Sequence, residues 1–209
     1  FEHHAYPDTI RDTLGEAAAA TVLLASTLKF EGLLTLQMQG PGPMHLLVAQ
    51  TTHRMALRAV ARWKGELPAD ANLQALAGSG GQITVTIENT DRTSRYQGVV
   101  PLTGDGLAGS LQHYFERSEQ LPTRLSLAAT PERAAGLLLQ RLPSGASASA
   151  EEDELQAAQG DEDWNRVLHL AHTITPEELV QLPGSELLRR LFHEEDVRMF
   201  DAGPVFFQC

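Results

Sequence analysis

A stretch of apolar and small residues, GEAAAATVLLASTL, occupies Gly15 to Leu28, and from Ala17 onwards it carries no charge. Its alanine, leucine and valine residues are spaced to place apolar contacts on every side of a helix, whereas a surface helix has one polar face. A bilayer crossing needs about 20 apolar residues, and Lys29 ends this stretch too early. The pattern therefore predicts a helix that is buried on all sides and covered by sheets.

Around this helix, alternating apolar and polar positions predict strands. The helix begins near Ile10 with Asp8 or Thr9 as its cap, and it ends near Phe30, before Gly32. Residues 55–63 fit either a helix or a strand by periodicity, and their short length and flanking turns favour a strand. Strands are predicted over 34–38, 45–50, 55–63, 82–88, 95–102, 123–128 and 136–142, with short helices over 72–77, opened by Asn72, and from the cap Asp105 through Arg117.

At Pro143 the composition changes to PSGASASA, and EEDE follows at once. This flexible composition predicts a linker over residues 143–150, which divides a core domain (1–142) from a helical linker subdomain (151–200). Three helices are expected there: 155–172, one capped by Thr175 with Pro176 and Glu178 in its first turn, and 185–192. Residues 197–200 and 205–207 are apolar and predicted to be extended. The order of elements predicts an α+β fold with a β/α/β layered core around the buried helix.

Charge and cysteine content narrow the function classes. The 27 acidic and 16 basic residues give a formal charge of −11, which disfavours nucleic acid and anionic membrane surfaces as partners. The chain has one cysteine, Cys209, so no disulfide forms within one copy, and this fits a reducing, cytoplasmic location. An end on Cys209 after Val205-Phe206-Phe207, and a start on Phe1, indicate a piece of a longer protein. No signal peptide is visible in these residues, and they are equally compatible with a signal peptide that has been removed.

The sharpest chemical motif is G-x-G-x-x-G at Gly104 to Gly109, between a predicted strand and a predicted helix. That context suits a dinucleotide-binding loop, in which glycines let a pyrophosphate approach a helix N-terminus. Asp105, however, would place a negative charge at the phosphate, and Pro101 removes a hydrogen-bond donor from the preceding strand. A dinucleotide-binding enzyme that uses this loop is therefore the alternative function, and a glycine-rich turn with an Asp cap is the simpler interpretation.

Other candidate sites have weaker support. His169 and His172 lie on one helix face but lack further zinc ligands, and the cluster FHEED at residues 192–196 is interpreted as a solvated helix end. Ser110 and His113 lie three residues apart, without a nucleophile elbow around any serine. The loop from Gly78 to Gly81 lacks the Lys-Ser/Thr of a phosphate-binding loop. No catalytic or cofactor-binding residue is predicted, and the protein is not expected to be an enzyme.

Several motifs together resemble one family, the redox-regulated holdase chaperones known as heat shock protein 33. They are STLKFEG (26–32), QGPGPM (39–44), WKGELP (63–68), RYQGVV (95–100), YFERSEQLPT (114–123) and LFHEED (191–196). The resemblance covers nearly the whole chain in the family's order, and none of these motifs is catalytic.

The resemblance implies a core of sheets around a buried helix, a helical linker and a small zinc domain. In that domain a C-x-C and a C-x-x-C pair hold zinc when reduced and form disulfides when oxidised. Cys209 matches the first cysteine of the C-x-C, so residues 201–209 would begin a redox-switch domain that is otherwise missing. Zinc, for which Cys209 would be a ligand and redox-active cysteine only with that domain present, is not expected in this chain.

The expected function is that of an ATP-independent holdase, which binds exposed apolar segments of unfolded proteins and prevents their aggregation under oxidative stress. The linker helices are predicted to cover an apolar sheet face. A homodimer is also expected, because the segment Val205-Phe206-Phe207 suits pairing with a neighbour's sheet edge.

Overall fold

The computed structural model describes residues 5–67, 71–91, 94–103, 106–142 and 150–208, with the backbone alone for residues 150–158. The predicted flexible linker and the Asp105 cap lie outside the described residues, except that Ala150 belongs to a helix. Within the described part, no helix combines the length and the hydropathy that crossing a membrane would need.

A six-stranded sheet forms one side of the core. Its strands run in the order β5-β4-β1-β2-β3-β8, and every neighbouring pair is antiparallel except β3 and β8. Their bounds are β1 Gly32–Gln39, β2 Met44–Thr52, β3 Ala56–Trp63, β4 Gln82–Asn89, β5 Arg95–Pro101 and β8 Phe206–Phe207. The choice of a strand for residues 55–63 is therefore confirmed over 56–63, and Met55 precedes the strand with a φ of +60°.

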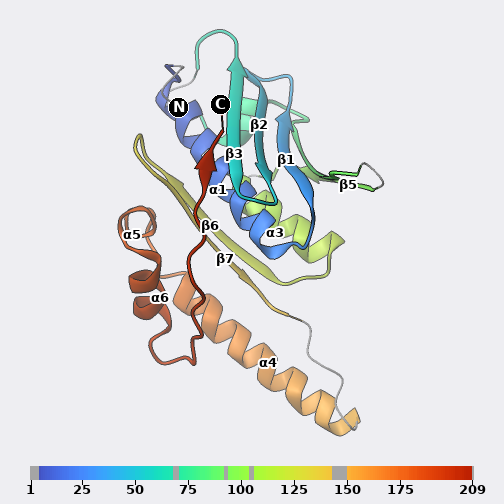
Figure 1. Cartoon of the computed structure of the whole chain (residues 1–209), viewed down its shortest axis with the longest axis vertical. Helices are drawn as coiled ribbons and strands as arrows, with labels where there is room; N and C mark the ends of the chain where they lie inside the picture. Colours follow the sequence, from blue (N-terminus) through green and yellow to red (C-terminus); the bar gives the residue numbers. More distant parts are fainter. Residues whose placement is uncertain (1–4, 68–70, 92–93, 104–105, 143–149, 209) are drawn as a thin grey trace.

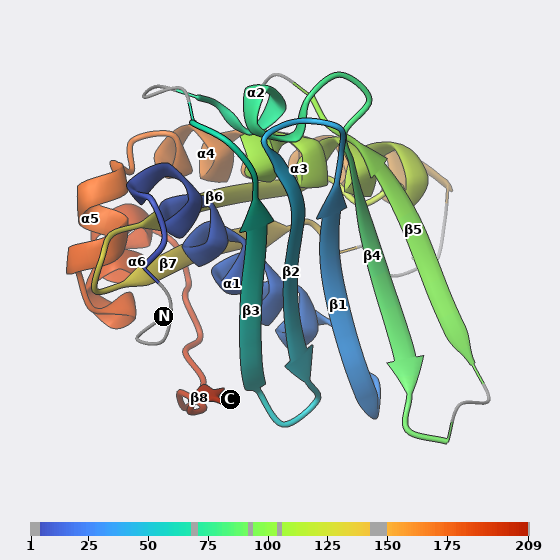
Figure 2. The same ribbon diagram turned by 90° about the horizontal axis from the view of Figure 1, so that it is seen from above.

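The helix α1 (Asp8–Thr27) lies between this sheet and the two-stranded sheet of β6 (Thr123–Ala129) and β7 (Ala134–Gln140), as Figure 2 shows. From Ala17 to Ala25 no residue of α1 is exposed. A Cβ at Gly15 would come within 2.7 Å of the Ala129 Cβ, so the hairpin crosses the helix closely there. The helix α3 (Gly106–Ser118) lies beside α1 and adds Leu107 and Leu111 to the same core. The predicted α+β layered core is confirmed.

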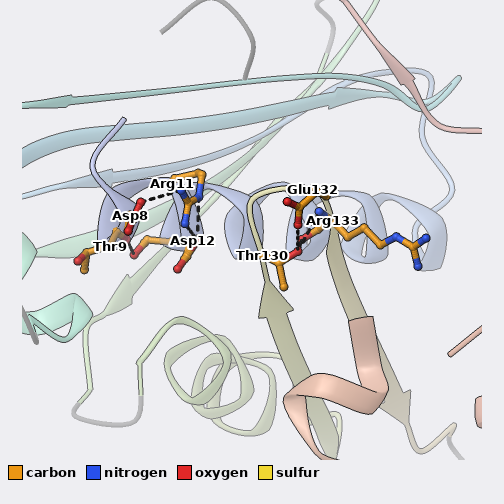
Figure 3. Close-up of polar contacts among 8 residues, drawn as sticks. Asp8, Thr9, Arg11, Asp12, Thr130, Glu132 and Arg133 are labelled. Atoms are coloured by element: carbon orange, nitrogen blue, oxygen red, sulfur yellow. Dashed lines mark hydrogen bonds and ion pairs between the residues drawn. The ribbon is translucent and has the colours of Figure 1, made fainter. Parts of the chain in front are cut away.

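The start and the end of α1 differ from the prediction. Asp8 is the first helical residue, and Pro7 takes the cap position without a side-chain hydrogen bond. The Asp8 carboxylate instead accepts a hydrogen bond from Arg11 at 2.7 Å, and Arg11 also binds Asp12 (Figure 3). The helix ends at Thr27 because the backbone of Leu28 is extended. Asn72, by contrast, caps α2 (Leu73–Ala77) as predicted, and its Oδ1 accepts from the Ala75 N–H at 2.9 Å.

Three helices follow the hairpin and lie on its far side from α1 (Figure 1): α4 (Ala150–Ala171), α5 (Pro176–Gln181) and α6 (Gly184–Phe192). The capping box at α5 is confirmed, because the Thr175 hydroxyl accepts from the Glu178 N–H at 3.2 Å and the Glu178 carboxylate accepts from the Thr175 N–H at 3.1 Å. The chain then returns to the large sheet, where residues 197–200 form no regular element and β8 joins the edge of β3.

Candidate functional site

The outer face of the β6–β7 hairpin is an apolar surface under a helical cover. Alternate residues of the hairpin face α1, and the others, Ala128, Ala135, Leu137 and Leu139, face the helices α4 to α6. Together with the helices they form a second cluster, separate from the main core. Its buried members on the helical side are Ala171, Leu179, Val180, Leu187, Leu191 and Phe192. We call this cluster the hairpin–helix seam.

The seam is closed less completely than the core. The core side chains of α1 and the large sheet are almost fully buried, for example Leu14, Leu36 and Leu47, whereas every residue of β7 from Ala135 to Gln140 is only half-buried. Because β7 is only half-buried, less additional apolar surface of β7 meets water when the helices move away from it. Burial of apolar surface therefore holds the helical cover less firmly than it holds the elements of the main core.

Ion pairs at the surface link the helices of the cover to one another, to the segment after α6 and to the end of β7. Arg166 of α4 donates to both oxygens of Glu195, at 2.7 and 3.0 Å, and to Asp163 at 2.9 Å. These bonds lower the pKa of Glu195 and of Asp163. Arg190 of α6 pairs with Glu178 of α5 at 2.8 Å, and Arg141, next to β7, pairs with Asp161 of α4. Exposed pairs of this kind contribute little and weaken with salt.

The predicted acidic cluster FHEED thus has a structural role, since Glu195 is a partner of Arg166. His169 places Nδ1 2.7 Å from the Asn165 carbonyl oxygen of its own helix. Among the residues that the structure describes, no three His, Cys, Asp or Glu side chains are grouped to hold a metal. Cys209 lies outside the described residues.

The loop of the alternative function has the wrong surroundings for a dinucleotide. Gly104 and Asp105 lie outside the described residues. The strand before the loop, β5, is an antiparallel edge strand, and the strand after α3, β6, belongs to the other sheet. A dinucleotide-binding loop lies instead between neighbouring parallel strands. The Ser110 hydroxyl also serves the loop itself, because it donates to the Gly106 carbonyl oxygen at 2.7 Å and accepts from the Thr103 N–H at 3.0 Å.

The glycine loop at 78–81 is likewise structural. Gly78 has a φ of +79° and ends α2, and a Cβ there would come within 2.6 Å of the backbone nitrogen of Gly42. Gly42 in turn donates to the carbonyl oxygen of Ala77 at 2.8 Å. Two glycine-rich segments therefore hold each other closely at one end of the sheet.

Apolar side chains are also exposed after α6. They are Val197, Met199, Phe200, Val205, Phe206 and Phe207, and their exposed fractions run from 40% to 79%. The sequence showed this segment to be apolar and extended. It did not show where the segment lies, because its partner, the edge of β3, is about 150 residues away in the chain.

Comparisons with known proteins agree with this architecture. A family model described as Hsp33 protein matches residues 1–209. The 33 kDa chaperonin of Nitrosococcus oceani is 47% identical over 207 residues, covering 99% of this chain and 66% of that protein. The 33 kDa chaperonin of Methylobacillus flagellatus is 43% identical over 209 residues, covering 100% and 67%. This chain therefore spans about two thirds of the length of these relatives.

A solved structure is similar in fold. It is the crystal structure of the 33 kDa chaperonin (heat shock protein 33 homolog) from Thermotoga maritima, with a TM-score of 0.75 and 20% sequence identity. The match covers 95% of this chain and 67% of that one.

Proposed function

This chain belongs to the Hsp33 family, and from that premise we propose that it acts as an ATP-independent holdase chaperone. The observation that carries the proposal is the hairpin–helix seam, an apolar face of β6 and β7 under a cover that leaves β7 half-buried. The clients are unfolded or misfolded proteins, and the action is binding without catalysis.

Binding requires the cover to move. An apolar patch larger than a monomer normally exposes attracts apolar segments of other chains. When α5 and α6 leave the hairpin, Ala135, Leu137 and Leu139 become such a patch, and the apolar side of the helices becomes a second one. The large negative charge of the chain opposes association between loaded complexes and keeps them in solution.

Redox control through zinc has no support in the described residues. A structural zinc site takes four ligands, and in a redox switch these are thiolates, whereas this chain has one cysteine. The residues of this chain therefore do not fit a zinc or disulfide switch. The role of Cys209 as a ligand and redox-active residue belongs to a protein that contains the remaining cysteines, and opening of the seam in this chain needs no oxidation.

A homodimer and a cytoplasmic location complete the proposal. The exposed apolar side chains between Val197 and Phe207 supply surface for self-association. Sedimentation velocity at several protein concentrations tests the dimer, and a single monomeric species at all of them contradicts it.

Light scattering tests the chaperone activity. Two unrelated client enzymes are unfolded and diluted into buffer with reductant and no nucleotide, with or without the 209-residue chain. We expect scattering from both clients to fall in proportion to the chain added. Protection of neither client refutes the proposal. Protection of only one points instead to a scaffold with a fixed partner.

A further inference from the structure

The edge of β3 that faces away from β2 carries a short strand, β8, which is held mainly through its backbone. β8 pairs with β3 in parallel, in the register Ala56 to Phe206 and Leu57 to Phe207. The Phe206 N–H donates to the Met55 carbonyl oxygen at 3.0 Å, and the Gln208 N–H donates to the Leu57 carbonyl oxygen at 2.8 Å. The side chains of Phe206 and Phe207 remain 55% and 67% exposed. This pairing therefore depends on strand hydrogen bonds more than on burial.

The same edge is capped at its other end by a side chain. Ala61 donates its N–H to the Tyr6 hydroxyl at 3.5 Å, and the Tyr6 ring lies 5.6 Å from that of Trp63. Between the two caps lies Ala59, whose backbone faces the edge in the same way as that of Leu57 and Ala61. In the described part of the chain nothing bonds to Ala59 there. An open edge that is covered only at its ends is a template for another strand.

The opposite edge of the sheet is a poorer template. β5 contains Gly98 and ends at Pro101, which has no N–H to give to a ladder. Its residue Tyr96 is also tied to Tyr114 and Glu119 of the α3 region. Strand addition is therefore favoured at β3 over β5.

We propose that the edge of β3 accepts an extended apolar segment of an unfolded polypeptide as an added parallel strand, in the place that β8 occupies. This inference rests on the proposed chaperone function and names a second contact for its clients. β8 shows the chemistry of the occupant, since its two phenylalanines and the preceding Val205 are apolar and of high strand propensity. In strand addition the backbone supplies the affinity and tolerates many sequences, which suits a protein with diverse clients.

In the intact chain β8 competes with any incoming strand. A tethered strand acts at an effective concentration on the order of millimolar, so a peptide in solution binds weakly until β8 leaves. Binding and release of β8 therefore set the access of clients to this edge.

Fluorescence anisotropy with a labelled peptide of residues 203–208 tests the proposal. In the full 209-residue chain, Phe206→Pro with Gln208→Pro removes the two N–H donors of β8. The matched control is Phe207→Pro, because the Phe207 N–H alternates with those two and faces away from β3. We expect the double variant to bind the peptide at least about tenfold more tightly than the wild type or the control.

A second measurement does not depend on how the variants fold. A peptide N-methylated at the positions of Phe206 and Gln208 loses both donors to β3, and one N-methylated at the position of Phe207 keeps them. We expect the first to bind the double variant at least about tenfold more weakly than the second.

Three results overturn the proposal. They are equal binding of the two methylated peptides, equal binding by wild type and double variant, and a double variant that dimerises and excludes the peptide, since a second copy is then the occupant. If the peptide-binding experiments fail while the chain still prevents client aggregation, only the edge site is refuted. If the chain does not prevent client aggregation but binds the peptides with the expected strand specificity, only the proposed chaperone function is refuted.

Discussion

A Cβ on Gly98 would overlap the hydroxyl group of Tyr114, so the glycine in β5 and the tyrosine in α3 occupy one shared space. Tyr114 is 8% exposed, and its hydroxyl donates to Glu119 at 2.9 Å and also contacts the hydroxyl of Tyr96. Burial and the bonds to Glu119 raise the pKa of both tyrosines, so both stay neutral at ordinary pH. Two of the motifs that resemble the heat shock protein 33 family, RYQGVV and YFERSEQLPT, therefore meet at this contact.

Replacing Gly98 with alanine should destabilise the core, because the added methyl group forces Tyr114 out of place. Overpacking of this kind costs roughly 1–3 kcal/mol. Thermal unfolding followed by circular dichroism measures it. Gly184→Ala is the control, since a Cβ there meets nothing within 4 Å and should leave the melting temperature nearly unchanged. Equal melting temperatures for the two variants would show that Tyr114 moves aside without cost.

Leu191→Ala should increase client protection. Leu191 is 2% exposed and belongs to the hairpin–helix seam, so its truncation weakens the cover without entering the main core. Loss of a buried leucine costs roughly 2–5 kcal/mol where the site cannot collapse. We expect the concentration that halves client scattering to fall severalfold.

Arg189→Ala is the matched control for Leu191, because Arg189 is exposed on the same helix. It should leave the scattering curve unchanged. If hydrogen exchange in α6 of the Leu191 variant is faster but the variant suppresses client aggregation no better than the wild type, the hairpin–helix seam is not the client surface.

Arg166→Ala should loosen the segment after α6, because Arg166 links Glu195 to α4. Hydrogen exchange by mass spectrometry should show faster exchange at residues 193–198, and high salt should have the same effect on the wild type. The bond from Arg166 lowers the pKa of Glu195 below its usual 4.5, so this contribution is present above that pH and is lost as pH falls through the lowered value. Arg117→Ala on the exposed side of α3 serves as the control. Unchanged exchange after α6 would assign the segment's order to Leu191 and its neighbours instead.

Glu16→Gln should stabilise the protein in neutral and alkaline buffer. Glu16 lies in α1 one turn after Asp12 and directly after Gly15, which Ala129 at the end of β6 approaches closely. Burial and the charge of Asp12 raise its pKa from 4.5 to about 7. The folded state therefore binds more protons than the unfolded state between these values, and stability falls as pH rises through this range.

For the wild type, the free energy of unfolding should fall by about 2 kcal/mol between about pH 5 and about pH 8. Glu16→Gln should remove this pH dependence, because glutamine does not titrate. Urea unfolding at the two pH values measures this change in the free energy of unfolding. An equal change for the wild type and Glu16→Gln would contradict a raised pKa for Glu16.

The sequence by itself determined the elements and the class of the fold. The charge-free run that starts at Ala17 predicted a helix buried on all sides, and the structure keeps it covered as far as Ala25, whereas residues 26–28 are exposed. Alternation at β4 and β5 predicted a sheet with one face in the core. The capping box at Thr175 needed four adjacent residues and was therefore visible without the fold. The family resemblance followed from motifs that are local in the same sense.

Tertiary structure decided what depends on distant partners. The apolar segment before Cys209 was predicted to pair with a neighbour's sheet edge, and here it pairs with the chain's own β3. The sequence of a strand shows that its backbone N–H and C=O groups need partners, but it does not identify the partner strand, because backbone hydrogen bonds are the same for every sequence. Only the folded chain, by bringing Phe206 to Met55, makes that choice.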